Sequence, residues 1–161
     1  MLMITRIVSG GQTGVDRGAL DAAIEAGLEH GGWCPRGRHA EDGAIPQRYR
    51  LAETPSPRYE VRTEWNVRDS DGTLVLASGP VSGGTKLTVE CARKYARPCM
   101  IVDLRENADA EAVAEWIGEN GIEVLNVAGP RASDAPGIGE MARRFVLEVT
   151  ARDTSRTPAS S

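Results

Sequence analysis

Apolar residues form short continuous runs that alternate along the chain with longer amphipathic stretches. The continuous runs have the length of buried strands and cover residues 3–8, 73–77, 99–103 and 122–127. The amphipathic stretches carry apolar residues three or four positions apart and begin near Val15, Leu87, Ala110 and Ile138. Strands that are apolar throughout and alternate with amphipathic helices are typical of a parallel sheet covered on both faces. We therefore predict an α/β fold: a single domain with a Rossmann-like, doubly wound, mostly parallel sheet of four or five strands.

One stretch, residues 31–72, interrupts this alternation. It holds four prolines, seven arginines and seven acidic residues without a clear helical pattern, and Tyr59–Thr63 in it is consistent with a short strand. An irregular segment of this length is uncommon in a compact domain and is often functional. We predict a ligand-binding domain over residues 1–151 that includes this Pro/Arg-rich segment, followed by a disordered polar tail over residues 152–161.

Composition and charge narrow the class of protein. The 161 residues suit one ordinary domain, and the net charge of −4 argues against a dedicated nucleic-acid binder, which normally has a basic excess. No apolar run reaches the length of a signal peptide or of a membrane span. The three cysteines, Cys34, Cys91 and Cys99, lack the paired spacing of a secreted disulfide framework. We expect a cytoplasmic protein that binds neither nucleic acid nor membrane.

Two glycine-rich loops each connect a predicted strand to a predicted helix, at residues 9–14 and 79–85. In open α/β sheets ligands bind at this edge, where free N–H groups and the helix dipole attract an anion. Glycine also allows the backbone to approach a phosphate closely, and Thr13 and Thr85 could add hydroxyl donors. A glycine turn can simply be the shortest connection, but two such loops in one small sheet favour a ligand site.

The common signatures of nucleotide, metal and hydrolase sites are absent. No G-x-x-x-x-G-K-[ST] motif occurs, and Ser9 stands where the dinucleotide motif G-x-G-x-x-G needs its first glycine. His30, Cys34 and His39 are close in sequence, but zinc would need a fourth ligand and a regular spacing. No Ser/His/Asp set can be placed.

The irregular segment contains further candidates. Asp69–Gly72 has the spacing that opens a cation loop, so Asp71 is a candidate for Mg²⁺ beside a phosphate, although an Asx-rich turn explains it more simply. A basic, aromatic loop over the glycine-lined edge would suit a flat heterocycle with a phosphate, and a solvated arginine surface is the equal alternative. The residues concerned are Arg36, Arg38, Arg48, Arg50, Trp33, Tyr49, Tyr59 and Trp65. The negative charge of Asp16 is favoured at the positive, N-terminal end of the first predicted helix. Because it would repel an anion bound at the same end, we expect its side chain to point away from that anion.

Several motifs together resemble one family. The run Ser9-Gly-Gly-Gln-Thr-Gly-Val-Asp-Arg17 is similar to the first signature of the molybdenum-cofactor carrier family, the circularly permuted YpsA branch of the SLOG superfamily. Further matches within residues 7–103 are Pro35–Gly37, Glu41–Gly43, Ile45–Pro46, Tyr49–Thr54, Arg62–Thr63, Asn66, Asp69–Leu74, Gly83–Thr85 and Thr88.

The resemblance implies a Rossmann-like fold, a homo-oligomer such as a tetramer, and the molybdenum cofactor as carried ligand. This cofactor is a pterin that bears a phosphate and a dithiolene-bound metal. The implied binding residues of the two loops are Gly10, Gly11, Gln12, Thr13, Gly14, Ser82, Gly83, Gly84 and Thr85. Arg36 and Asp71 complete the predicted site, with Mg²⁺ as a second candidate ligand.

We therefore expect a carrier that binds a phosphorylated heterocycle without breaking a bond and that serves a molybdoenzyme or a cofactor-biosynthesis partner. The alternative is a nucleotide phosphoribohydrolase, because relatives in the wider superfamily cleave nucleoside monophosphates with a G-G-x-G-T-x-x-E motif. Here the third glycine is missing, and Glu90 comes two positions late, about 200° around a helix. Such an enzyme would use Glu90 or Glu64 with Arg17. A sensor that binds a nucleotide without turnover is the third hypothesis.

Overall fold

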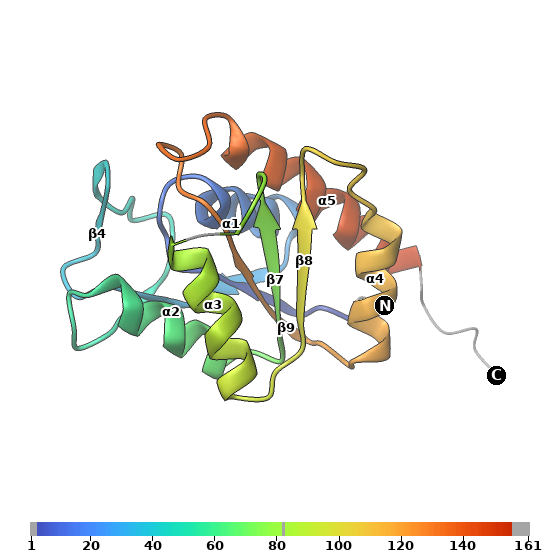
Figure 1. Cartoon of the computed structure of the whole chain (residues 1–161), viewed down its shortest axis with the longest axis horizontal. Coiled ribbons are helices and arrows are strands. Elements are labelled where there is room, and N and C mark those ends of the chain that lie inside the picture. The colour runs from blue at the N-terminus through green and yellow to red at the C-terminus, as the bar shows by residue number, and fades with distance from the viewer. Residues whose placement is uncertain (1–2, 82, 156–161) are drawn as a thin grey trace.

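The computed structural model describes residues 3–81 and 83–155, with a fully parallel five-stranded sheet at its centre (Figure 1). Across the sheet the order is β2 (Glu29–Gly31), β1 (Arg6–Val8), β9 (Val124–Ala128), β7 (Gly72–Ala77) and β8 (Cys99–Asp103). Every residue of β7 is buried, as its unbroken apolar pattern predicts for a strand covered on both faces.

Helices cover both faces of this sheet (Figure 1). One layer consists of α1 (Val15–Ala26), α4 (Ala110–Glu119) and α5 (Ile138–Ser155), which share the main hydrophobic core with the strands. The other layer consists of α2 (Tyr59–Arg68) and α3 (Gly83–Lys94), which pack around Val67, Cys91 and Ala92. The predicted α/β, Rossmann-like, doubly wound architecture is confirmed. None of the helices in the described ranges is long and apolar enough to cross a lipid bilayer.

The connections create a crevice at one edge of the sheet. From β1 the chain passes through α1 to β2, whereas from β7 it passes through α3 to β8 on the opposite side. The last strand, β9, returns to fill the place between β1 and β7. Because the connections after β1 and β7 leave in opposite directions, the carboxyl ends of these strands frame a crevice over β9, where doubly wound sheets bind ligands.

The last helix joins both ends of the domain. Asp153, which is buried near the end of α5, accepts hydrogen bonds from the N–H groups of Met3 (2.9 Å) and Ile4 (3.0 Å). The helix continues to Ser155, so residues 152–155, which were predicted as part of a disordered tail, are helical. Residues 156–161 lie outside the described residues.

The Pro/Arg-rich segment forms a lobe beside the sheet. It contains a parallel pair, β3 (Trp33–Cys34) with β6 (Ala52–Glu53), and an antiparallel pair, β4 (His39–Ala40) with β5 (Gly43–Ala44). A small separate core beneath the lobe is made by Leu20, Cys34, Ile45 and Tyr49. The segment is therefore ordered by local packing of its own.

The strand predicted at Tyr59–Thr63 is wrong, because these residues begin α2. Val61 and Thr63 favour a strand locally, but Pro57 precedes a helix that buries Val67 against α3. Tertiary packing thus overrides local preference here. The second glycine loop is also shorter than predicted, because Gly83–Thr85 already form the first turn of α3.

Candidate functional site

A cavity of about 570 Å³ lies at the carboxyl ends of β1, β9 and β7. Its walls are the loops after these three strands, the first turns of α3 and one side of α2. The polar residues and glycines that line it are Gln12, Asp16, Tyr59, Glu60, Arg62, Thr63, Ser78, Gly83, Gly84, Thr85, Thr88, Gly129, Arg131 and Asp134. Its volume and its place in the fold are those of a small-molecule site.

The start of α3 forms an open wall of this cavity. Gly83, Gly84 and Thr85 line it, and the first N–H groups of a helix have no acceptor within the helix. A Cβ atom placed on Gly84 would meet nothing within 4 Å, so the space beside this residue is free. The helix dipole and these donors make this wall the most suitable position for an anion. Ser82, which was predicted with them, lies outside the described residues.

Several N–H groups in and just after the first glycine loop are already used within the protein. Gln12 N–H donates to Asp16 Oδ2 (3.1 Å), and Thr13 N–H donates to Gln12 Oε1 (3.1 Å). Val15 N–H donates to the carbonyl oxygen of Pro130 (3.1 Å). Of the five residues predicted here, only Gln12 lines the cavity. This loop therefore offers fewer free donors to an anion than the start of α3 does.

The glycines of that loop permit close packing. Gly11 and Gly14 both have a φ of 82°, which favours glycine. A Cβ on Gly11 would lie 2.7 Å from Leu51 Cδ1, and one on Gly14 would lie 2.8 Å from the amide nitrogen of Ala132. Larger residues at these positions would disturb the lobe and the loop after β9.

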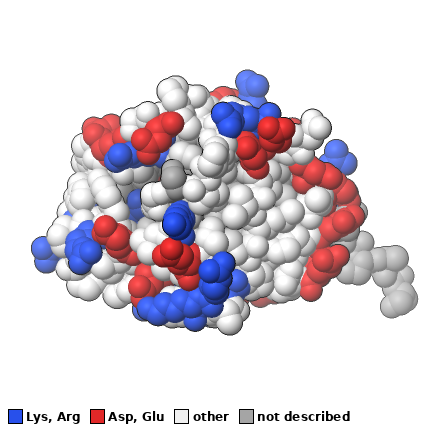
Figure 2. All heavy atoms as spheres, in the orientation of Figure 1, with Lys and Arg blue, Asp and Glu red and all other residues white. Residues whose placement is uncertain are grey.

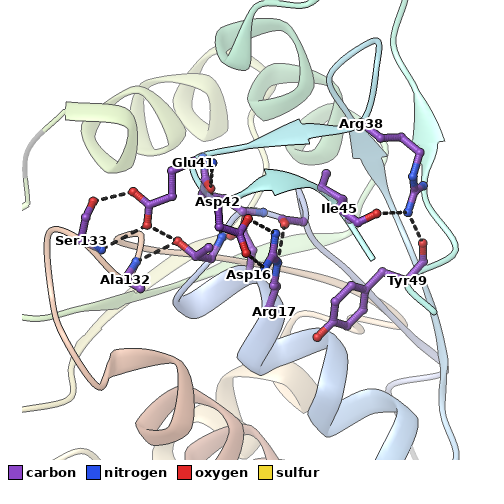
Figure 3. Close-up of polar contacts among 12 residues, drawn as sticks. Asp16, Arg17, Arg38, Glu41, Asp42, Ile45, Tyr49, Ala132 and Ser133 are labelled. Carbon is purple, nitrogen blue, oxygen red and sulfur yellow. Dashed lines mark hydrogen bonds and ion pairs between the residues drawn. The ribbon is translucent and has the colours of Figure 1, made fainter. Parts of the chain in front are cut away.

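A carboxylate from the lobe holds the first loop against the loop after β9 (Figure 3). Glu41 accepts hydrogen bonds from the hydroxyl groups of Thr13 and Ser133, the latter at 2.5 Å. The hydrogen bonds from Ser133 and then from Thr13 lower the pKa of Glu41. Next to it, Arg17 makes a two-pronged ion pair with Asp42 (2.6 and 2.8 Å). The Thr13 hydroxyl is thus occupied and does not face a ligand.

Two residues that were not among the predicted binding residues, Asp16 and Arg62, lie together in the cavity wall. Arg62 Nη1 is 3.7 Å from Asp16 Oδ2, and both side chains are largely buried. Burial raises the pKa of Asp16, while the Arg62 charge and the Gln12 N–H oppose this rise. Arg62 lies across Gly10, where a Cβ would come within 2.7 Å of Nη1. Gly10 therefore makes room for the arginine.

Arg62 has donor capacity to spare. Its Nη1 donates to the Thr63 hydroxyl (3.2 Å), but its buried Nε has no hydrogen-bond partner within residues 3–81 and 83–155. This Nε is shielded from solvent, as is the equally unpaired Nε of Arg38, so a ligand in the cavity would meet the outer guanidinium nitrogens of Arg62 and not its Nε. The sequence signal is the helical spacing of Tyr59, Arg62 and Thr63, which places all three on one side of α2.

Arg36 and Asp71 lie away from the cavity. Arg36 is exposed and donates to the carbonyl oxygen of Pro55 (3.2 Å). Asp71 lies at the amino end of β7, the opposite edge of the sheet, where it accepts hydrogen bonds from Glu123 N–H (3.1 Å) and Val124 N–H (2.8 Å). The structure therefore does not bring Arg36 and Asp71 together with the residues that line the cavity. No group of three or more metal-ligating side chains occurs in the described part of the chain, so nothing supports a Mg²⁺ site.

The other arginines and aromatics of the lobe have mainly structural roles. Arg38 donates to four backbone carbonyl groups, those of Ile45, Pro46, Tyr49 and Leu51. Figure 3 draws the hydrogen bonds to Ile45 and Tyr49. Trp33 packs edge-on against Trp65, and of the four aromatic residues only Tyr59 lines the cavity.

The residues that a hydrolase would use are not assembled in the cavity. Glu64 is held by the Tyr95 hydroxyl (2.7 Å) and by Lys94 (3.2 Å), whereas Arg17 is engaged with Asp42. Glu90 is exposed on α3 and does not line the cavity.

Comparisons with known proteins agree with this architecture. A model of the "Circularly permutated YpsA SLOG family" matches residues 7–150. The chain is also similar to the crystal structure of a "Putative molybdenum carrier protein" from Syntrophus aciditrophicus SB, with 46% identity and a TM-score of 0.86. This similarity covers 92% of this chain and 96% of that one. No curated protein matches the chain. Because the family model matches nine-tenths of its length and the fold is doubly wound, the chain belongs to the circularly permuted YpsA family of SLOG proteins.

Proposed function

We propose that this protein is a carrier that binds the molybdenum cofactor, through its phosphate and its pterin, in the cavity above β9. The observation that carries the proposal is the pairing of two features in one cavity: the free first turn of α3 and the positively charged side chain of Arg62. Both features suit an anionic ligand. The family membership and the description of the Syntrophus relative as a molybdenum carrier support the choice of cargo.

The residues present suit a phosphorylated heterocycle. A phosphate beside Gly84 would accept hydrogen bonds from the N–H groups at the start of α3, and the space beside Gly84 is open. The guanidinium group of Arg62 and the ring of Tyr59, 5.4 Å apart, offer flat surfaces to a planar ring system. A cavity of about 570 Å³ holds a ligand of this size. In this proposal the protein binds and shields its cargo, and no bond is broken.

We also propose that the chain forms a homo-oligomer, such as a tetramer, in the cytoplasm and delivers its cargo to a molybdoenzyme or a cofactor-biosynthesis partner. The outer strand β8 is an open sheet edge on which Ile101 is 48% exposed. Figure 2 shows a broad uncharged area on this face, while acidic and basic side chains are mixed around it. An open sheet edge with an exposed apolar side chain such as Ile101 favours contacts between proteins.

The decisive variant is Gly84→Leu, which fills the open space beside the start of α3. The matched control is Gly118→Leu, since Gly118 is also helical, exposed and free of neighbours within 4 Å, but lies on α4 away from the cavity. Both variants are incubated with the molybdenum cofactor under anaerobic conditions, and the bound cofactor is measured by native mass spectrometry. We expect wild type and Gly118→Leu to retain it and Gly84→Leu to lose at least about nine-tenths. Equal retention by the two variants would contradict the proposed binding site.

A further inference from the structure

The outer strand β8 leaves part of its backbone unpaired. It pairs with β7 on one side, and no strand within residues 3–81 and 83–155 lies on its other side. Pro98 and Leu104, which flank the strand, both bond to β7 through their backbones (2.9 Å each), so the even-numbered positions face β7. Because the backbone polar groups alternate along a strand, those of Cys99 and Ile101 point outward. This row of free N–H and C=O groups is a template for another strand.

The two edges of the sheet differ in their protection. The opposite edge, β2, is three residues long and carries the exposed charge of Glu29, and the lobe lies beside it, with Arg50 N–H donating to His30 (3.1 Å). The edge β8 is five residues long, and Cys99–Val102 contain neither a charge nor a proline. Short strands, charges and prolines are the usual means by which natural edges avoid pairing. Only β8 lacks them.

The surface over β8 suits contact with another protein. Ile101 lies at the middle of the strand and is 48% exposed. The strand lies toward the viewer in Figure 1, and Figure 2 shows an uncharged area over its middle. The one charged residue of β8, Asp103, lies at its end and accepts hydrogen bonds from the N–H groups of Gly79 (3.1 Å) and Arg105 (2.9 Å).

We propose that β8 pairs with β8 of a second copy of this chain, antiparallel and about a two-fold axis at Ile101. This proposal specifies the interface of the homo-oligomer proposed above and therefore rests on it. Each Ile101 then lies opposite its own symmetry mate in a hydrogen-bonded pair, with Cα atoms about 5.5 Å apart. The same outward groups are satisfied on both sides, as a two-fold interface requires.

The charges permit this register. Asp103 comes opposite the uncharged Cys99 of the second copy, so no like charges face each other within the strand pair. Arg97 and Arg105, just outside the strand, come opposite one another, but both are held by their own copy. Arg97 donates to the carbonyl oxygen of Arg68 (3.1 Å), and Arg105 pairs with Asp103 (3.8 Å).

The paired sheets form a closed unit with two independent cavities. The outer edges that remain are the two β2 strands, whose length and charge oppose further pairing. Because the two copies run antiparallel, their cavities, at the carboxyl ends of the strands, open at opposite ends of the combined sheet. Each copy can therefore load its cargo without obstruction by the other.

The experiment replaces Ile101 with charges of either sign and reads the mass of the cofactor-free protein by native mass spectrometry. Ile101→Lys and Ile101→Glu should each raise the dissociation constant at least about a hundredfold, because two buried isoleucines are lost and two like charges meet at the axis. Mixing the two variants should restore a mixed complex, since opposite charges then meet. Ile24→Lys is the matched control, because Ile24 is 45% exposed on α1, and it should leave the mass unchanged.

Circular dichroism checks that each variant is folded. An unchanged mass of both Ile101 variants, or two dissociated variants that do not recombine, would overturn the self-pairing, and the proposed homo-oligomer would then use another surface. A monomeric wild type would overturn both. Cofactor retention by wild type is measured separately, so the carrier function is decided independently of this interface.

Discussion

The close approach of α1 and α5 gives the sharpest test of the packing. Gly18 lies on α1 opposite Gly139, which is on α5. A Cβ placed on Gly18 would overlap the carbonyl oxygen of Gly139 and would lie 3.1 Å from the Cβ of Ala142. The overlapped atom belongs to the backbone, so a side-chain rotation cannot relieve the clash, and the two helices must move apart. We therefore predict that Gly18→Ala destabilises the protein.

The magnitude follows from two opposing effects. Overpacking of a close-packed interior costs about 1–3 kcal/mol. Replacing a helical glycine with alanine returns about 0.5–1 kcal/mol through helix propensity. Because the overlapped atom belongs to the backbone, the cost should lie in the upper half of its range, about 2–3 kcal/mol. The net loss is then about 1–2.5 kcal/mol, which lowers the melting temperature of a domain of this size by about 2–10 °C.

Gly118→Ala is the matched control, because it makes the same chemical change in a helix with nothing within 4 Å. It should stabilise the protein by about 0.5–1 kcal/mol, so the two substitutions have opposite signs. The assay is urea unfolding followed by circular dichroism, with a comparison of midpoints at equal slope. A Gly18→Ala protein as stable as wild type would refute the close helix packing described above.

Three further perturbations separate structural residues from the binding site. Asp71→Ala removes an acceptor of two backbone N–H groups, so the free energy of unfolding should fall by about 1–3 kcal/mol while cofactor retention stays unchanged; a variant that loses cofactor but not stability would return this residue to the site. Burial, followed by the hydrogen bond to Asp21, raises the pKa of Tyr49 from 10.0 to about 12. The folded protein thus favours the neutral phenol, and the stability it provides is complete below pH 10.0 and is lost as the pH rises toward about 12. Urea unfolding across this pH range should show that Tyr49→Phe flattens this loss, and an identical pH dependence would contradict the assignment. Glu41→Gln weakens the contact between the lobe and the loop after β9, so the amide of Ser133 should exchange its hydrogen faster; unchanged exchange would show that the contact does not hold the loop.

The regular part of the fold could be predicted from the sequence because each element carries its own pattern. The apolar run of β7 and the helical spacing that begins at Val15 are local signals, and both elements appear where they were expected. The edge strand β2 was missed, because Glu29–Gly31 is short and polar and becomes a strand only through pairing with β1. The helix α2 was missed for a similar reason, since its packing against α3 joins residues distant in sequence.

The candidate site was predicted in part. The position of the glycines at strand ends located the crevice, and Gly83, Gly84 and Thr85 do line it. The sequence could not show that several N–H groups in and after the first loop are already occupied, since the acceptor of Val15 N–H is Pro130, more than one hundred residues away. Nor could it single out Arg62 among the seven arginines of the irregular segment, because its pairing with Asp16 depends on the true structure of α2.

The measurement that tests the central claim most directly is anaerobic native mass spectrometry with molybdenum cofactor and AMP offered together in equal amounts. One spectrum reports the bound mass, the oligomer size and any breakdown of AMP. The account predicts that the protein retains the cofactor, leaves AMP intact and unbound, and forms a homo-oligomer. Bound or cleaved AMP with the cofactor left free would contradict the carrier function and would identify the cavity as a site of nucleotide chemistry.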